Sequence, residues 1–237
     1  MMDRPFELIV VGAGLAGAEL AALSALAGRH TLLLTTSMDT IFNVASTPAE
    51  LSMHDSWLAA PYLQEHGDVI RSNYQLHQSV KYRLEELDDV LVKQSTVTDL
   101  LIEDGAVLGV RTWEGHEYRA PATVLAVGSF LQARLTVGEL TETAGRLSET
   151  AYDDLYDHLV GLGFAFEPFT LEEPGNDVTP TYTVTAQRFA PGERLFGSFA
   201  LPRFSGLYAV GNCVNGPLTY EQAVTDGATL AAQLAAQ

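Results

Sequence analysis

The stretch ELIVVGAGLAGAEL, residues 7–20, constrains the fold of this 237-residue chain more than any other segment. Four apolar residues at 8–11 predict a buried strand, and three glycines spaced as G-x-G-x-x-G follow it directly, before a helical run. In this arrangement Gly12 allows a tight turn, Gly14 lets backbone amides approach a pyrophosphate, and Gly17 lets helix and strand pack closely. The helix N-terminus adds free N–H groups and the positive end of its dipole. The segment predicts a dinucleotide-binding turn, the alternative being a glycine-rich turn without a ligand.

The segment that follows the first helix lacks an expected acid. A dinucleotide-binding domain usually carries an Asp or Glu about 20 residues after the turn, where it binds the adenosine ribose. Here that neighbourhood reads TLLLTTS, residues 31–37, without any acid. The hydroxyls of Thr35, Thr36 or Ser37 are the candidates to meet the ribose instead. The missing acid argues against a standard NAD site and only weakly against an FAD site.

The first half of the chain predicts an α/β fold with a parallel sheet. Continuous apolar runs at 8–11 and 31–35 flank a helix that ends near Gly28, which makes a βαβ unit buried on both faces. Residues 37–72 are interpreted as irregular. Apolar residues at helical spacing then predict a helix over 73–87.

Residues 89–128 carry two hairpin signals, Asp104-Gly105 and Glu114-Gly115. They predict a strand that rejoins the main sheet, a three-stranded antiparallel meander, and a return strand at 122–127. A meander at this point is uncommon in NAD dehydrogenases and usual in FAD domains of the glutathione-reductase type.

The C-terminal part returns to the sheet. GLYAVGN, residues 206–212, predicts a buried strand, and Thr219 with Gln222 fits a capping box at the start of a long Ala-rich helix. Such a return is typical of FAD domains, where an acid after the glycine binds the ribityl or phosphate end and the helix dipole stabilises reduced flavin. Here Asn212 stands in place of that acid. The alternative is an ordinary terminal βα unit.

Between these parts, a helix is predicted over 150–162, and proline-rich extended strands and turns over 163–205. The predicted fold is therefore a Rossmann-like FAD-binding domain of the glutathione-reductase type with an antiparallel β-meander and a small inserted subdomain. The FAD-binding domain comprises residues 1–138 plus 204–237, and residues 139–203 form the subdomain.

Composition excludes some classes of function. With 30 acidic and 13 basic residues the formal net charge is −17, which disfavours direct nucleic-acid binding because such affinity depends on Lys and Arg. Ten acids and one arginine, Arg146, lie between Glu139 and Asp177, a run interpreted as a solvated face or flexible segment. A single cysteine, Cys213, and the lack of a secretory pattern or a membrane-length apolar run predict a cytoplasmic, soluble protein without membrane association.

Four segments together resemble the GidA family: VVGAGLAGAELAA, LLLTTSMDTI, ATVLAVGSFLQARLTVG and GLYAVGNCVNGPLTYEQA. Members of this family are FAD-dependent enzymes that modify the wobble uridine of tRNA, and in them a strand without the usual acid is normal. The resemblance implies that the backbone at Val97 meets the adenine. It implies an FAD site formed by the following residues: Gly12, Ala13, Gly14, Ala16, Gly17, Gly128, Gly211 and Asn212.

The chain also departs from the family. Full-length members are far longer, with a nicotinamide-related insertion and a helical tRNA-docking domain, and residues 139–203 are a short substitute. The family carries a cysteine just before Asn-Pro-Ala, where this chain has Ser46 before Thr47-Pro48-Ala49. A serine without an adjacent base is a poor nucleophile. We therefore do not expect this chain to modify tRNA alone.

Other polar residues are weaker candidates. His54 and Asp55 lie where the reactive face of the flavin is in the family, as an acid–base pair or simply as solvated side chains. Asp154 and His158 have i, i+4 spacing, which fits a metal site less well than a solvated pair, because a third ligand is not evident. Cys213 is interpreted as a structural thiol.

Three hypotheses of function follow. The first is an FAD-binding redox enzyme or redox subunit, with any NAD(P)H bound transiently against the flavin because a second glycine motif is absent. The second is an accessory protein with structural FAD that acts through a protein partner in tRNA modification. The third, a NAD-binding oxidoreductase, is disfavoured by the meander and the C-terminal return.

Overall fold

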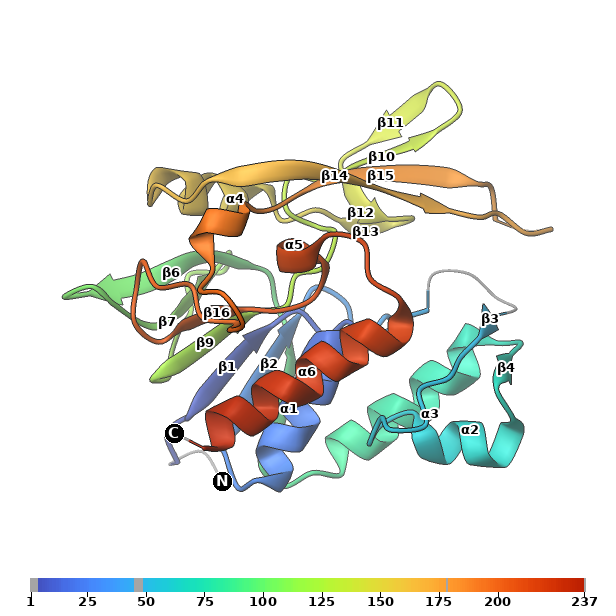
Figure 1. The fold of residues 1–237 in the computed structure, drawn as a ribbon, viewed down its shortest axis with the longest axis horizontal. Helices are drawn as coiled ribbons and strands as arrows, with labels where there is room; N and C mark the ends of the chain where they lie inside the picture. Colours follow the sequence, from blue (N-terminus) through green and yellow to red (C-terminus); the bar gives the residue numbers. More distant parts are fainter. Residues whose placement is uncertain (1–3, 45–48, 178, 237) are drawn as a thin grey trace.

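A parallel sheet of five strands forms the centre of the molecule in a computed structural model that describes residues 4–44, 49–177 and 179–236 (Figure 1). β1 pairs in register with both β2 and β9, so that Leu8 lies opposite Thr31 and Ala122. Every residue of these three strands is buried, as their continuous apolar runs predict. In spatial order the strands are β16 (Leu207–Ala209), β9 (Ala122–Leu125), β1 (Leu8–Val11), β2 (Thr31–Thr35) and β5 (Val90–Gln94).

Helices cover one face of this sheet. Leu8 and Val10 of β1 pack in the same core as Leu20 of α1, Leu76 of α3 and Leu230 of α6. Figure 1 shows α1 and α6 side by side below the sheet, with α2 and α3 beyond them. The helices are α1 (Leu15–Leu26), α2 (Ala60–His66), α3 (Asn73–Glu85) and α6 (Tyr220–Ala235).

The other face is covered by the antiparallel meander and one helix. Ile9 and Val11 of β1 pack with Val110 of the meander and Leu155 of α4 (Asp153–Gly161) in a second core. Because successive residues of a strand point to opposite faces, β1 supplies both cores in turn. The meander consists of β6 (Val97–Glu103), β7 (Ala106–Thr112) and β8 (Glu117–Arg119).

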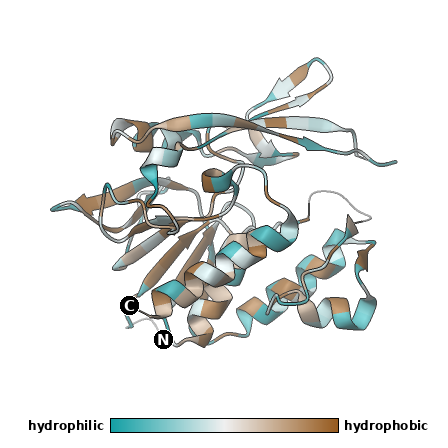
Figure 2. Ribbon diagram, in the orientation of Figure 1, coloured by the Kyte–Doolittle hydropathy of each residue, from teal (hydrophilic) through white to brown (hydrophobic). Residues whose placement is uncertain are grey.

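A second sheet lies above the carboxyl ends of the parallel strands in Figure 1 and is antiparallel. Its strand order is β11 (Leu140–Glu142), β10 (Arg134–Val137), β15 (Tyr182–Phe189) and β14 (Phe166–Glu173). A hairpin of β12 (Ala144–Arg146) and β13 (Glu149–Thr150) shares its small third core. Figure 2 shows the difference in composition: the parallel strands are predominantly hydrophobic and the upper sheet mixes both kinds of residue.

The predicted fold class is confirmed: the chain has a Rossmann-like α/β fold with a parallel sheet, a meander at 97–119 and a C-terminal return. The predicted boundary of the 150–162 helix is wrong at its start, because Thr150 pairs with Ala144 in β13 and α4 begins at Asp153. Short additional elements are β3 (Ala49–Glu50), β4 (Val69–Ile70), η1 (Pro191–Glu193) and α5 (Asn212–Asn215). The division at residue 139 stays a proposal.

The interpretation of residues 37–72 as irregular is also wrong, because they contain α2. The turn before this helix is held by Glu19 of α1, whose carboxylate accepts hydrogen bonds from Ser56 Oγ (2.7 Å) and Trp57 N (2.6 Å). Burial raises the pKa of Glu19 above its ordinary value, and these bonds oppose the shift. Glu19 lies far from this turn in the sequence, so the residues of the turn alone do not predict the helix.

Candidate functional site

One cleft opens at the carboxyl ends of four parallel strands, between the two sheets. Gly12 follows β1, Thr36 follows β2, Ala126 follows β9 and Val210 follows β16, and all four line it. Open α/β sheets bind ligands at this edge, where the strand order reverses. The space between the surrounding atoms is about 1110 Å³ when the open mouth of the cleft is included.

The floor of the cleft is the glycine turn, and its glycines differ in what they do. Gly12 has φ +104°, a left-handed value that glycine adopts readily. A Cβ on Gly17 would lie closer than 3.0 Å to the carbonyl oxygen of Gly12 and to Cβ of Ala126. A Cβ on Gly14 would meet no protein atom within 4 Å. Gly12 and Gly17 therefore serve the fold, whereas the bare backbone at Gly14 keeps space in the cleft free.

A second wall comes from the C-terminal segment. Asn212 lines the cleft, as do Thr219 and Tyr220 at the beginning of α6. Thr219 Oγ1 accepts a hydrogen bond from Gln222 N (3.2 Å), and Gln222 Oε1 accepts one from Thr219 N (2.9 Å), which confirms the predicted capping box. The N-terminus of this long helix therefore faces the cleft, and its dipole places partial positive charge there.

Glu221, the next residue of α6, has a structural role. Its Oε1 accepts hydrogen bonds from Ser52 N (3.0 Å) and Ser52 Oγ (3.1 Å). The bond from the Ser52 backbone is the main cause that lowers the pKa of Glu221. The carboxylate thus ties the segment after β3 to the start of the last helix.

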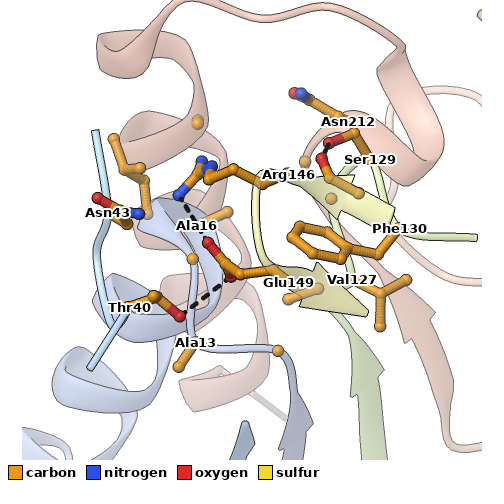
Figure 3. Close-up of a pocket in the computed structure, with 18 of the residues that line it drawn as sticks. Ala13, Ala16, Thr40, Asn43, Val127, Ser129, Phe130, Arg146, Glu149 and Asn212 are labelled. Carbon is orange, nitrogen blue, oxygen red and sulfur yellow. Dashed lines mark hydrogen bonds and ion pairs between the residues drawn. The ribbon is translucent and has the colours of Figure 1, made fainter. Parts of the chain in front are cut away.

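The roof of the cleft carries charged side chains (Figure 3). Arg146 of β12 and Glu149 of β13 form an ion pair of 3.7 Å, with side chains 23% and 11% exposed. Thr40 Oγ1, from the loop after β2, donates a hydrogen bond of 3.0 Å to Glu149 Oε2. The hairpin is held on its other side by Ser129, whose Oγ donates to the Gly145 carbonyl oxygen (3.3 Å). Hydrogen bonds to two loops that follow strands of the parallel sheet therefore hold the hairpin that carries the ion pair.

Two further titratable groups belong to the roof. Glu173 and Tyr182 are opposite each other on β14 and β15, and both line the cleft. Burial raises the pKa of Glu173, and the guanidinium of Arg146 opposes this shift. Burial also raises the pKa of Tyr182, to about 12. The acidic run at 139–177 is thus wrongly interpreted as only solvated, because Glu149 and Glu173 face the cleft.

The structure brings most of the predicted site residues together in this cleft. Val97 does not line it; this residue lies in a neighbouring pocket with Trp113, and Tyr152 contributes to both pockets. Gly17 and Ser37 are also not part of the cleft lining, and Ser37 Oγ accepts a hydrogen bond from Asp39 N (3.2 Å). Predicted residues that line the cleft are Gly12, Ala13, Gly14, Ala16, Thr35, Thr36, Gly128, Gly211 and Asn212.

The weaker candidates lie elsewhere. His54 Nε2 is 3.3 Å from Asp68 Oδ1 at the surface, and neither His54 nor Asp55 lines the cleft. Cys213 is fully buried, its thiol donates to the carbonyl oxygens of Leu125 and Val210, and burial raises its pKa to about 12. Ser46 lies outside the described residues.

His158 pairs with a residue outside its own helix. Its Nδ1 is 3.2 Å from Asp99 Oδ1, and its Nε2 accepts a hydrogen bond from Leu100 N (3.1 Å). Burial lowers its pKa, and the nearby Asp99 opposes that shift. The contact joins α4 to β6, and the described part of the chain contains no group of three metal-binding side chains.

The comparison with known proteins agrees with this geometry. The family model described as glucose inhibited division protein A matches residues 7–72 and 64–170, which is more than half of the chain. The chain belongs to the GidA family. The GidA-related protein from Thermus thermophilus is 39% identical, with a TM-score of 0.86 over 98% of each chain.

Other relatives are longer. MnmG of Bacillus subtilis, a tRNA uridine 5-carboxymethylaminomethyl modification enzyme, is 27% identical over 222 residues, which cover 82% of this chain and 35% of that enzyme. GidA of Aquifex aeolicus shares the fold with a TM-score of 0.85 at 16% identity, over 99% of this chain and 64% of that chain. The chain thus spans about a third of the length of the curated relatives that it matches.

Proposed function

We propose that this chain of the GidA family is an FAD-binding flavoprotein that works as a redox enzyme or redox subunit. The observation that supports it is the convergence on one cleft of the glycine turn, the end of β16 and the N-terminus of α6. A bare Gly14 with open space on its Cβ side fits a ligand whose phosphates approach the backbone there. FAD, when bound, would supply hydride or electron transfer.

Different residues along the cleft would bind different parts of FAD. Under this proposal the backbone of the glycine turn binds the diphosphate, and Thr35 or Thr36 meets the ribose. The backbone at Val97 meets the adenine from the neighbouring pocket. Gly128, Gly211 and Asn212 contact the flavin end, where the dipole of α6 favours negative charge on the reduced ring. The binding set is Gly12, Ala13, Gly14, Ala16, Gly17, Thr35, Thr36, Val97, Gly128, Gly211 and Asn212.

The direct test is the spectrum of the purified protein. We expect a yellow preparation, and we expect flavin-free protein to bind FAD with a melting temperature that rises with FAD concentration. NAD⁺ at the same concentration serves as the control. A colourless protein that is stabilised by NAD⁺ and not by FAD would contradict the proposal.

A second candidate function is an accessory role with structural FAD and a protein partner. It is favoured by the position of the two predicted acid–base candidates, since neither His54 nor Asp55 lines the cleft. Anaerobic mixing with NADH or NADPH separates the two roles. A redox enzyme bleaches the flavin absorbance rapidly, whereas a structural flavin is reduced slowly or not at all. His54 and Asp55 stay weak acid–base candidates, to be tested by alanine variants in that assay.

We also propose that any link to tRNA modification runs through a partner in the cytoplasm and not through direct tRNA binding. A net charge of −17 repels a polyanion such as tRNA, whose binding depends on Lys and Arg. Within the described residues, no helix has the length and apolar character to cross a membrane. A filter-binding assay at physiological salt should show no retention of tRNA, and tight retention would contradict this part.

A further inference from the structure

The cleft holds few charges for a site that is to bind a diphosphate. Among the described residues that line it, Arg146 is the one with a cationic side chain, whereas Glu149 and Glu173 are acidic. The chain as a whole carries a net charge of −17, which adds a repulsive field for an anionic ligand. A diphosphate therefore depends on the backbone of the floor and on Arg146.

Arg146 is not tightly held by its partner in the protein. The shortest distance between its guanidinium and the Glu149 carboxylate is 3.7 Å, longer than a hydrogen bond. Glu149 is more firmly placed, because it also accepts the hydrogen bond from Thr40. A bidentate anion would suit the fork of guanidinium donors better than this long ion pair does.

Glu149 lies close to the glycine turn. Its partner Thr40 belongs to the loop in which Phe42 N donates a hydrogen bond of 2.8 Å to the Ala13 carbonyl oxygen. In Figure 3 the Arg146–Glu149 pair extends across the cleft toward this loop, between Thr40 and Phe130. The carboxylate therefore sits beside the part of the floor that the proposed function assigns to the diphosphate.

We propose that Arg146 is the counter-ion of the bound diphosphate, and that Glu149 is an internal anion that Arg146 exchanges for it when the nucleotide binds. The inference rests on the proposed function, since FAD is the diphosphate in question. In the flavin-free protein Glu149 neutralises Arg146. On binding, the guanidinium turns to the phosphate oxygens while Glu149 keeps the hydrogen bond from Thr40.

The exchange predicts opposite effects of two conservative variants. Arg146→Gln removes a charge-assisted contact and should weaken FAD binding about 10- to 100-fold. Glu149→Gln keeps an acceptor for Thr40 but removes the competing charge, so it should tighten FAD binding roughly three- to tenfold. Arg146→Lys keeps the charge without the bidentate geometry and should recover part of the affinity.

The measurement is a titration of flavin-free protein with FAD, followed by fluorescence quenching, together with the melting temperature without flavin. Matched controls are Arg134→Gln and Glu167→Gln, which change one surface charge each on neighbouring strands outside the cleft lining. We expect both controls to bind like the wild type. Glu149→Gln should lower the melting temperature of the flavin-free protein while it raises affinity, a combination that a purely structural role does not produce.

Each other outcome overturns the exchange. If Glu149→Gln weakens binding as Arg146→Gln does, the pair acts as a structural strap of the roof. If neither variant changes affinity, Arg146 does not contact the diphosphate. These results leave the FAD-binding proposal intact, because that proposal depends on the wild-type titration; a folded wild type that binds no FAD contradicts the proposed function itself.

Discussion

The floor and the roof of the cleft are built on different principles. The floor is main chain: Gly12, Ala13 and Gly14 line the cleft with backbone groups. The roof is side chain: Arg146 and Glu149 reach in from the β12–β13 hairpin, and Glu173 and Tyr182 from the upper sheet. Backbone groups recognise what all dinucleotides share, whereas side chains distinguish one ligand or oxidation state from another. Substitutions in the floor should therefore destabilise the fold or abolish binding of any dinucleotide. Substitutions in the roof should change the affinity for one ligand and the pH dependence of stability.

The largest effect is expected at Gly17. In an open helix, Gly→Ala gains about 1 kcal/mol of stability. Here the new Cβ would lie closer than 3.0 Å to the Gly12 carbonyl oxygen and to Cβ of Ala126, on the rigid backbone of the turn. We expect Gly17→Ala to lower the free energy of unfolding by at least about 3 kcal/mol, measured by urea denaturation.

Gly14→Ala is the matched control for this substitution. It adds the same methyl group three residues earlier, where the new Cβ meets no protein atom within 4 Å. We expect its stability to stay within about 1 kcal/mol of the wild type. If both variants are equally unstable, the division of the glycine turn into structural and ligand-facing positions is wrong.

The next largest effect concerns binding at Gly14. Gly14→Leu adds a bulky side chain at a cleft position where the new Cβ meets no protein atom within 4 Å, so we expect the fold to persist and FAD affinity to fall at least about 100-fold. Retention of flavin absorbance after gel filtration checks this directly. A variant that stays yellow would contradict the assignment of the floor.

The floor could be predicted from the sequence because its constraints are local. The positive φ of Gly12, the close approach of Gly17 to the Gly12 carbonyl oxygen and the capping box of Thr219 each depend on residues a few positions apart. The apolar runs of β1 and β2 are equally local, and they predicted a sheet buried on both faces. The prediction succeeded where the structure of a short segment is determined by the residues of that segment.

The roof could not be predicted because it is assembled by tertiary structure. Arg146, Glu149 and Glu173 come from three strands, and their spacing follows no helical or strand period that points to a ligand. An excess of acidic residues normally indicates a solvated face. The composition of residues 139–177 therefore did not show that Glu149 and Glu173 face the cleft. A single arginine within that acidic run was the one available signal, and by itself it does not specify a site.

A smaller effect tests how the roof is attached to the floor. A Cβ on Gly145 would lie closer than 3.0 Å to three ring atoms of Phe130, in the segment after β9. The Phe130 ring packs edge-on against Tyr152, with 6.4 Å between the ring centroids. We expect Gly145→Ala to cost about 1–3 kcal/mol by displacing this ring. Urea denaturation of a double-mutant cycle with Phe130→Ala checks the cause, because the methyl group should cost little once the ring is gone. Equal costs in both backgrounds would place the strain elsewhere.

The smallest effect is a pH dependence at Glu173. Burial raises the pKa of this half-buried carboxyl, so between its unfolded pKa near 4.5 and its higher folded value the native state retains a proton that the unfolded chain has lost. Stability of the wild type is therefore lost as pH rises through this window. Glu173→Gln does not titrate, so its melting temperature should match the wild type near pH 4 and exceed it by roughly 1–3 °C at pH 7 to 8.

Glu172→Gln is the control for this pH dependence, since the neighbouring residue on β14 is exposed and points to the opposite side of the strand. Its difference from the wild type should not change with pH. The result that would overturn the prediction is a loss of stability in Glu173→Gln at neutral pH. That loss would mean that the folded protein stabilises the ionised Glu173 carboxylate, and that Arg146, the cation opposing its pKa shift, pairs with Glu173 as much as with Glu149. The roof would then hold its arginine between two carboxylates, and a diphosphate would have to displace both.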